Sequence, residues 1–182
     1  IMHTGLAVSN FTFNDGLLGD MNIYGEWRND DTSIYLNAYM DESQEKGVTE
    51  VIGKIYPSAP INGLNLRIQA RGTNIAFLNK YMSGIANNVQ GRAYGEVQLF
   101  GPFSALNLEG ELYTQANLGI DALETRFQLN DTLQLSTKGI QFKKCKIGDM
   151  EGHLGSINGA LNYQHFKDLT FRFDINVDHM LL

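Results

Sequence analysis

The chain has 182 residues, a length that fits one domain of the usual ~100–200 residues. Hydrophobic residues make up 43% and charged residues 19%, which excludes charge-driven disorder, and no window approaches the ~18 uninterrupted apolar residues of a membrane-spanning helix. The net charge of -6 without a basic run argues against nucleic acid as a partner, and the single cysteine, Cys145, excludes an internal disulfide and a multi-cysteine metal site.

Alternation of apolar and polar residues with a period of two dominates the chain and predicts an all-β fold. In chain order, the clearest alternating runs are residues 34–40, 64–70, 93–99, 106–112 and 169–178. We expect about ten to twelve strands. They should be mostly antiparallel, because the connections are too short for crossovers.

Turn residues separate several of these runs. Turns are predicted at 27–32 and at 101–104, where Gly, Pro, Asn and Asp gather. Asn130-Asp131 lies between the apolar pairs that end at Leu129 and begin at Leu133, which predicts a further hairpin there.

One segment has helical rather than strand periodicity. Ile75, Leu78, Met82 and Ile85 recur at spacings of three and four, which predicts one short α-helix near residues 74–86 with an asparagine as its N-cap. Three turns cannot cover the whole apolar face of the sheet. The remaining face must meet another sheet or the same sheet curled over on itself, so a sandwich, a barrel and an open curled groove all satisfy the pattern.

The segment 91–112 carries a family resemblance. Its residues Gly-Arg-Ala-Tyr-Gly-Glu-Val-Gln-Leu-Phe-Gly, followed by Leu-Asn-Leu-Glu-Gly-Glu-Leu, resemble the G-x-A-x-G-x-(V/L)-x-L-x-G…L-x-L-x-G-x-(L/V) signature of the TamB family. The order and spacing are similar to the C-terminal domain of TamB-like, AsmA-related proteins of the Bacteroidetes group. The match continues through residues 127–132, 148–152, 159–161, 165–169 and 176–178.

The resemblance implies an all-β fold built from an antiparallel-rich sheet that curls into an apolar trough, a β-taco. It identifies residues 1–182 as a fragment of the C-terminal β-domain, with a subdivision into 1–73 and 87–182 around the short helix as a fallback. The sequence begins at Ile1 and stops at Leu182 without a polar tail, which also suggests a fragment. The membrane anchor then lies outside it.

The resemblance also implies a place and a function. Family members extend through the periplasm of Gram-negative bacteria from an anchor in the inner membrane, and they take part in phospholipid transfer between the membranes, in outer-membrane protein translocation and assembly, or in both. The partners implied are phospholipid acyl chains and an outer-membrane barrel protein of the BamA superfamily, similar to TamA.

An acyl chain needs a continuous dry surface, which strict alternation supplies without special residues. We expect the groove to be lined by the apolar residues of the strongest alternating runs. They are Leu64, Leu66, Ile68, Val97, Leu99, Leu106, Leu108, Leu112, Phe127, Leu129, Leu133, Leu135, Phe171, Phe173, Ile175 and Val177.

Enzymatic and metal chemistry find little support in the sequence. His3, His153, His165 and His179 show no pairing at i+3 or i+4, and no spaced nucleophile and base occur, so we expect no catalytic residues, no metal and no cofactor. Cys145 lies among three lysines that would lower the pKa of its thiol if they clustered around it, although a small residue on a strand is the commoner interpretation.

Two further functions stay open at this level. A carbohydrate-binding β-sandwich of a cell-envelope protein would use exposed rings, with Trp27, Tyr35, Tyr39, Tyr56 and Tyr94 as candidates. A chaperone-like module would use the edge of the sheet to template strands of incoming outer-membrane proteins.

Overall fold

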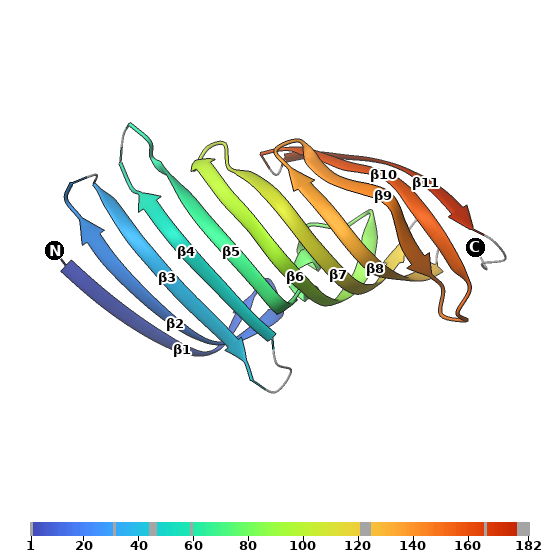
Figure 1. Cartoon of the computed structure of the whole chain (residues 1–182), viewed down its shortest axis with the longest axis horizontal. Helices are drawn as coiled ribbons and strands as arrows, with labels where there is room; N and C mark the ends of the chain where they lie inside the picture. The colour runs from blue at the N-terminus through green and yellow to red at the C-terminus, as the bar shows by residue number, and fades with distance from the viewer. Residues whose placement is uncertain are drawn as a thin grey trace.

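The structure, a computed structural model, describes residues 2–30, 32–43, 47–58, 60–120, 125–165 and 167–177. Eleven strands form one antiparallel sheet whose strand order is the order of the chain, from β1 at one edge to β11 at the other (Figure 1). Within the described residues no pairing joins β1 to β11, so the sheet is open. The expected all-β, antiparallel fold and the expected number of strands are confirmed.

The bounds of the elements follow the alternating runs closely. They are β1 (Met2–Phe13), β2 (Gly16–Arg28), β3 (Ser33–Glu42), β4 (Gly47–Tyr56), β5 (Gly63–Asn74), the 3₁₀ turn η1 (Ala76–Lys80), β6 (Ala86–Pro102), β7 (Asn107–Ile120), β8 (Thr125–Ser136), β9 (Gly139–Gly148), β10 (Leu154–Gln164) and β11 (Lys167–Val177).

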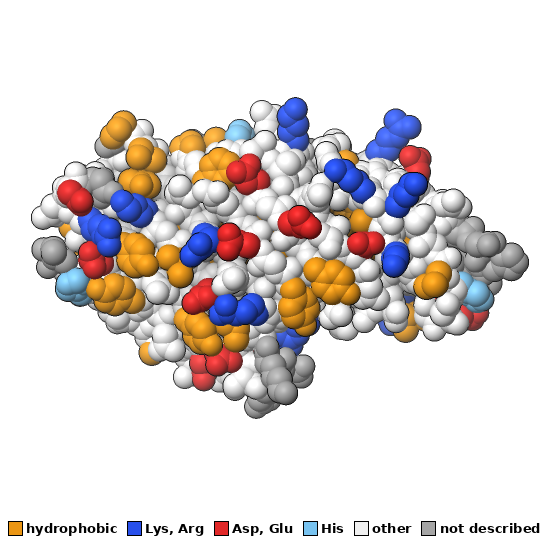
Figure 2. Space-filling model, in the orientation of Figure 1, with side chains coloured by type: hydrophobic (Ala, Val, Ile, Leu, Met, Phe, Trp, Pro, Cys, Tyr) orange, Lys and Arg blue, Asp and Glu red, His pale blue; other side chains and the backbone are white. Residues whose placement is uncertain are grey.

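The register gives the sheet two different faces. Between β5 and β6, Leu66 lies opposite Leu99 and Arg67 lies opposite Gln98. Since successive side chains point to opposite faces, we call the face that carries Leu66 and Leu99 the apolar face and the other the polar face. Figure 2 shows side chains of both charges scattered among hydrophobic ones over the face turned to the viewer. The ladder between β5 and β6 joins the described parts of segments 1–73 and 87–182 in one sheet.

The α-helix expected near residues 74–86 is wrong. The segment contains only the 3₁₀ turn η1, followed by a series of turns to Ile85. Among the described residues, none of the helical structure has the length and apolarity needed to cross a membrane. The periodicity still identified the inward side chains, because Ile75 is buried and Leu78 and Met82 pack against the same core.

Asn79 explains why an α-helix does not form. Its side chain donates hydrogen bonds to the carbonyls of Ala76 and Val89, both at 2.8 Å, and its Oδ1 accepts the N–H of Val89 at 2.7 Å. An asparagine that bonds the local backbone competes with helical hydrogen bonds. Gly84, at φ +84°, then turns the chain toward β6.

The hairpin expected at Asn130-Asp131 is also wrong, since both residues lie inside β8. The alternation continues through the pair, and Asp131 stays satisfied by accepting backbone N–H groups from Thr132 at 2.7 Å and from Lys146 of β9 at 2.9 Å. The register with β9 shifts between Leu129 and Gln134, but the pairing with β7 is continuous through Asn130 and Asp131, so the strand persists despite these turn-forming residue types.

The core consists of two packed clusters on the apolar face. The C-terminal cluster gathers residues of β6 to β10 with Ile75, around Phe127 and Cys145, which are 2% and 1% exposed. The N-terminal cluster gathers Met21, Ala38 and Met40 from β2 and β3. All strands of the described residues belong to the one sheet, so no second sheet covers the stretch between the clusters.

The turn between β1 and β2 contacts η1, although β3, β4 and β5 lie between them in the strand order. The rings of Phe13 and Phe77 lie 5.7 Å apart between centroids, and Asn14 Nδ2 donates to the Tyr81 hydroxyl at 2.9 Å. Gly16 is required at this contact, because a Cβ there would lie 2.7 Å from the Phe77 backbone nitrogen.

A second contact joins strands that are distant in the sheet. The ring Nδ1 of His165, at the end of β10, lies 3.3 Å from the carbonyl oxygen of Leu106, just before β7. Two strands, β8 and β9, separate these elements in the strand order.

Candidate functional site

The register places on the apolar face the predicted groove-lining residues that the described ladders pair, whereas Leu106 lies just before β7 and outside the ladders. In β5 to β8 they follow one another across the sheet, as in the row in which Leu99 lies opposite Leu66 and Leu108. In β11, Phe171 lies opposite Leu161 of β10. Val177 lies opposite Gly155 in the same ladder.

Burial divides the set into two parts. Phe127 and Leu129 are buried members of the C-terminal cluster, and Leu112, Leu133, Phe173 and Ile175 pack against it. Phe173 also meets the Phe142 ring edge-on, with centroids 5.1 Å apart. These residues form a filled core, which is the alternative that sequence periodicity left open for the whole face.

The second part lies outside both packed clusters and we call it the mid-sheet patch. Leu66 and Val97 are buried within it, and its other members are partly exposed. It comprises Leu64, Leu66, Ile68, Val97, Leu99, Leu106, Leu108 and Leu135. Phe171 is 51% exposed on the same face.

The patch continues into strands that the sequence prediction omitted. Ile55 of β4 lies opposite both Leu64 and Ile34, and Leu36 of β3 lies opposite Gly53. The alternating run 34–40 is the sequence signal for Ile34 and Leu36, whereas Ile55 lies outside that run.

Polar groups occupy the apolar face where β3, β4 and β5 approach η1. Glu42, 8% exposed, forms an ion pair with Arg92 Nη1, which also donates to the Gly72 carbonyl at 2.9 Å. The hydroxyl oxygens of Thr49 and Thr73 lie 2.6 Å apart. The charges compensate one another, so this end of the face is polar but paired.

Cys145 belongs to the C-terminal cluster and is not an activated thiol. Burial raises the pKa of the Cys145 thiol, although a backbone hydrogen bond at Lys143 acts in the opposite direction. The neighbouring lysines Lys144 and Lys146 are exposed. The hypothesis of a lysine-activated thiol is therefore wrong.

The histidines lie apart from one another. His3 and His153 have neighbours on their own hairpins, His165 contacts a backbone carbonyl, and His179 lies outside the described residues. Within the part of the chain that the structure describes, no three His, Cys, Asp or Glu side chains form a group that could hold a metal ion.

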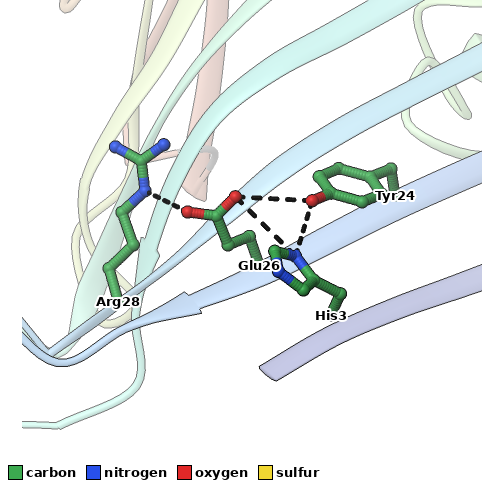
Figure 3. Close-up of polar contacts among 4 residues, drawn as sticks. All are labelled: His3, Tyr24, Glu26 and Arg28. Atoms are coloured by element: carbon green, nitrogen blue, oxygen red, sulfur yellow. Dashed lines mark hydrogen bonds and ion pairs between the residues drawn. The ribbon is translucent and has the colours of Figure 1, made fainter. Parts of the chain in front are cut away.

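The His3 contacts form a short polar chain on β1 and β2 (Figure 3). Its Nδ1 lies 2.6 Å from the Tyr24 hydroxyl, which is 3.4 Å from Glu26 Oε2, and Arg28 Nε donates to Glu26 Oε1 at 3.1 Å. Loss of hydration and the Glu26 carboxylate raise the pKa of Tyr24. The phenol therefore stays neutral and can donate to the carboxylate, and the chain of contacts ties the edge strand β1 to β2.

Asp149 organises the turn between β9 and β10. Its Oδ1 accepts the N–H groups of Glu151 and His153, both at 2.9 Å, and its Oδ2 lies 2.7 Å from His153 Nδ1. Desolvation raises the pKa of Asp149, but the hydrogen bonds from His153 and Glu151 outweigh it and leave the pKa lowered.

This lowered pKa makes the turn sensitive to acid. A carboxyl whose native pKa is below its unfolded value of ~3.9 stabilises the fold above that pH, and the contribution is lost as the pH falls through the native pKa. We expect Asp149→Asn to lower the urea midpoint at pH 7 and the difference from wild type to vanish toward pH 2. Glu151→Gln, an exposed neighbour, is the control. A difference that stays constant with pH would refute the assignment.

The five candidate rings for carbohydrate binding do not gather at one place. Trp27 lies on the apolar face opposite Ile34, whereas Tyr39 and Tyr94 lie on the polar face, Tyr94 with its ring 6.3 Å from that of Tyr113. Only Tyr35 and Tyr56 border the same depression. The expected sandwich architecture of this alternative is wrong, because the described strands form one sheet.

Comparisons of the chain with protein-family models, curated proteins and solved structures find no match. The class that the fold defines is an open, single-sheet antiparallel β protein with one partly exposed apolar face.

Proposed function

We propose that this chain is part of a TamB-like envelope protein of a Gram-negative bacterium and that its apolar face contacts phospholipid acyl chains in transit between the two membranes. The observation that carries the proposal is the mid-sheet patch, an apolar surface that no second sheet covers within the described residues. Contiguous exposed apolar surface of this kind marks interaction sites for proteins or lipids.

The proposal includes a sheet that curls around its apolar face. On a flat sheet with strands about 4.8 Å apart, β7 and β10 would lie roughly 14 Å from each other. The 3.3 Å contact between His165 and Leu106 supports a curl at that end, and the contact of the β1–β2 turn with η1 supports one at the other. Such a curl would turn the patch into the floor of a trough.

The energetics favour an acyl chain as occupant. Each methylene removed from water contributes about 0.8 kcal/mol, so a chain lying along the patch gains several kcal/mol without any specific polar contact. Eleven strands span about 48 Å, close to one bilayer and too short to join two membranes. The chain then serves as one segment of a longer conduit that ends at an outer-membrane barrel of the BamA superfamily.

The test places a charge on the patch. We expect Leu108→Asp, on the partly exposed part of the apolar face of β7, to remain folded and to lose most of the phospholipid that co-purifies with the parent chain, because a carboxylate in a dry path is costly. Mass spectrometry of extracted lipid and a thermal melt measure the two effects. The matched control is Gln115→Asp, which adds the same charge to an exposed position of the same strand on the polar face.

Phe173→Asp tests whether the mid-sheet patch differs from the packed core. Phe173 packs against the C-terminal cluster, so this variant should unfold where Leu108→Asp does not. Collapse of both variants, with no lipid bound to the parent, would overturn the proposal. Cross-linking of the β1 edge to nascent outer-membrane strands, with none to lipid, would favour the strand-templating function instead.

A further inference from the structure

A shallow depression of about 420 Å³ lies on the polar face across β2 to β5. Tyr35, Lys54 and Asn65 are direct cross-strand neighbours at its centre. The side chains that border it and carry the argument are Arg28, Tyr35, Lys54, Tyr56, Asn65 and Arg67. It is therefore separate from the apolar face and from the proposed acyl-chain contacts.

Two arginines of the depression keep unused donors among the described residues. Arg28 donates through Nε to Glu26, and its guanidinium carbon lies 5.1 Å from the centre of the Tyr35 ring. Arg67 has only a long ion pair, with its Nε 3.9 Å from Glu96 Oε2, and its side chain is 59% exposed.

Another arginine of the same strand is different. Arg71, four residues beyond Arg67 on β5, donates to Glu50 at 3.0 Å and to Gln69 at 2.9 Å. Arg71 is thus engaged by its neighbours, whereas the fork of Arg67 remains available for a bidentate anion.

The remaining groups suit a sugar. Tyr56 supplies aromatic surface of the kind on which sugar rings pack, whereas the Tyr35 ring already contacts the Arg28 guanidinium. The Oδ1 of Asn65 accepts a hydrogen bond from Gln98 at 2.8 Å, which orients its Nδ2 as a donor for a hydroxyl.

We propose that this depression binds a saccharide that carries a phosphate or carboxylate group, with the anion on Arg67 and the ring against Tyr56. The proposal does not depend on the acyl-chain function, because the two sites lie on opposite faces of the sheet.

The test is an NMR titration of the full chain with glucose 6-phosphate, glucuronate, glucose and inorganic phosphate. We expect the two anionic sugars to shift resonances of the residues that border the depression. They should bind at least about tenfold more tightly than glucose or phosphate, because ring and anion contacts add. If inorganic phosphate bound as tightly as the anionic sugars, the depression would be a simple anion site and the proposal would be overturned. The absence of any binding would overturn it as well.

Variants locate the site. Arg67→Gln should weaken the anionic sugars about tenfold, as expected for a lost charge-assisted contact. Arg71→Gln, the same change on the same strand, should leave the affinity unchanged. Tyr56→Ala should weaken the sugars more than phosphate. Equal effects of Arg67→Gln and Arg71→Gln would reveal general electrostatic attraction and refute the site.

Vesicles with and without phosphatidylinositol then distinguish a lipid headgroup from a free sugar as the source of the ligand.

Discussion

Phe127→Ala is expected to lower the free energy of unfolding by about 3–5 kcal/mol, which is the usual cost of truncating a buried phenylalanine. Phe127 is 2% exposed and sits in the cluster that joins β6 to β10 with Ile75 of the β5–β6 connection. The loss is a large fraction of the ~5–15 kcal/mol that stabilises a typical domain. Urea denaturation followed by circular dichroism measures it.

Phe103→Ala provides the matched control, because Phe103 is 47% exposed in the turn after β6. It should cost less than about 1 kcal/mol, as for most surface substitutions. Equal losses for Phe103 and Phe127 would contradict the position of the core.

Arg92→Met should have a comparable effect for an electrostatic reason. Glu42 is 8% exposed, and its ion pair with Arg92 compensates its charge. Removing one partner of a buried pair leaves an unpaired charge and costs about 3–5 kcal/mol. We expect the double variant Arg92→Met with Glu42→Leu to recover much of this loss, so a double-mutant cycle in urea gives a large coupling energy.

An exposed pair provides the comparison. Arg71 and Glu50 form an ion pair at 3.0 Å on the polar face, with side chains 51% and 28% exposed. Arg71→Met should cost no more than about 1 kcal/mol, because solvent screens such pairs. If Arg92→Met were equally mild, water would have to reach Glu42 freely, and the end of the apolar face near η1 would be open.

Alternation was sufficient to predict which side chains share a face. Leu64, Leu66 and Ile68 could be assigned to the apolar side because side chains alternate strictly along a strand. The same pattern could not separate core from exposed patch. That division depends on where Ile75 and Leu78 of the β5–β6 connection pack. The two-residue alternation of a strand carries no information about the position of a connection.

The two wrong elements have a common cause. The helix was expected from the spacing of Ile75, Leu78 and Met82, and the hairpin from the Asn130-Asp131 pair, which are both local signals. In the structure Asn79 is a bridge to Val89, and Asn130 lies inside β8 opposite Gln115 of β7. Long-range partners decided both outcomes. The depression on the polar face could not be predicted from the sequence for the same reason. Arg28 and Arg67 are distant in the sequence and border one depression only because β2 to β5 pair in order.

The sequential strand order has a mechanical consequence. Among the described residues, each strand shares a backbone ladder only with the strands before and after it in the chain, so the sheet resembles a one-dimensional array of neighbouring units. A force applied to β1 or β11 would peel hairpins away one at a time and leave the interior ladder intact. The array can also lengthen by adding further hairpins at either edge, without rearrangement of those already formed.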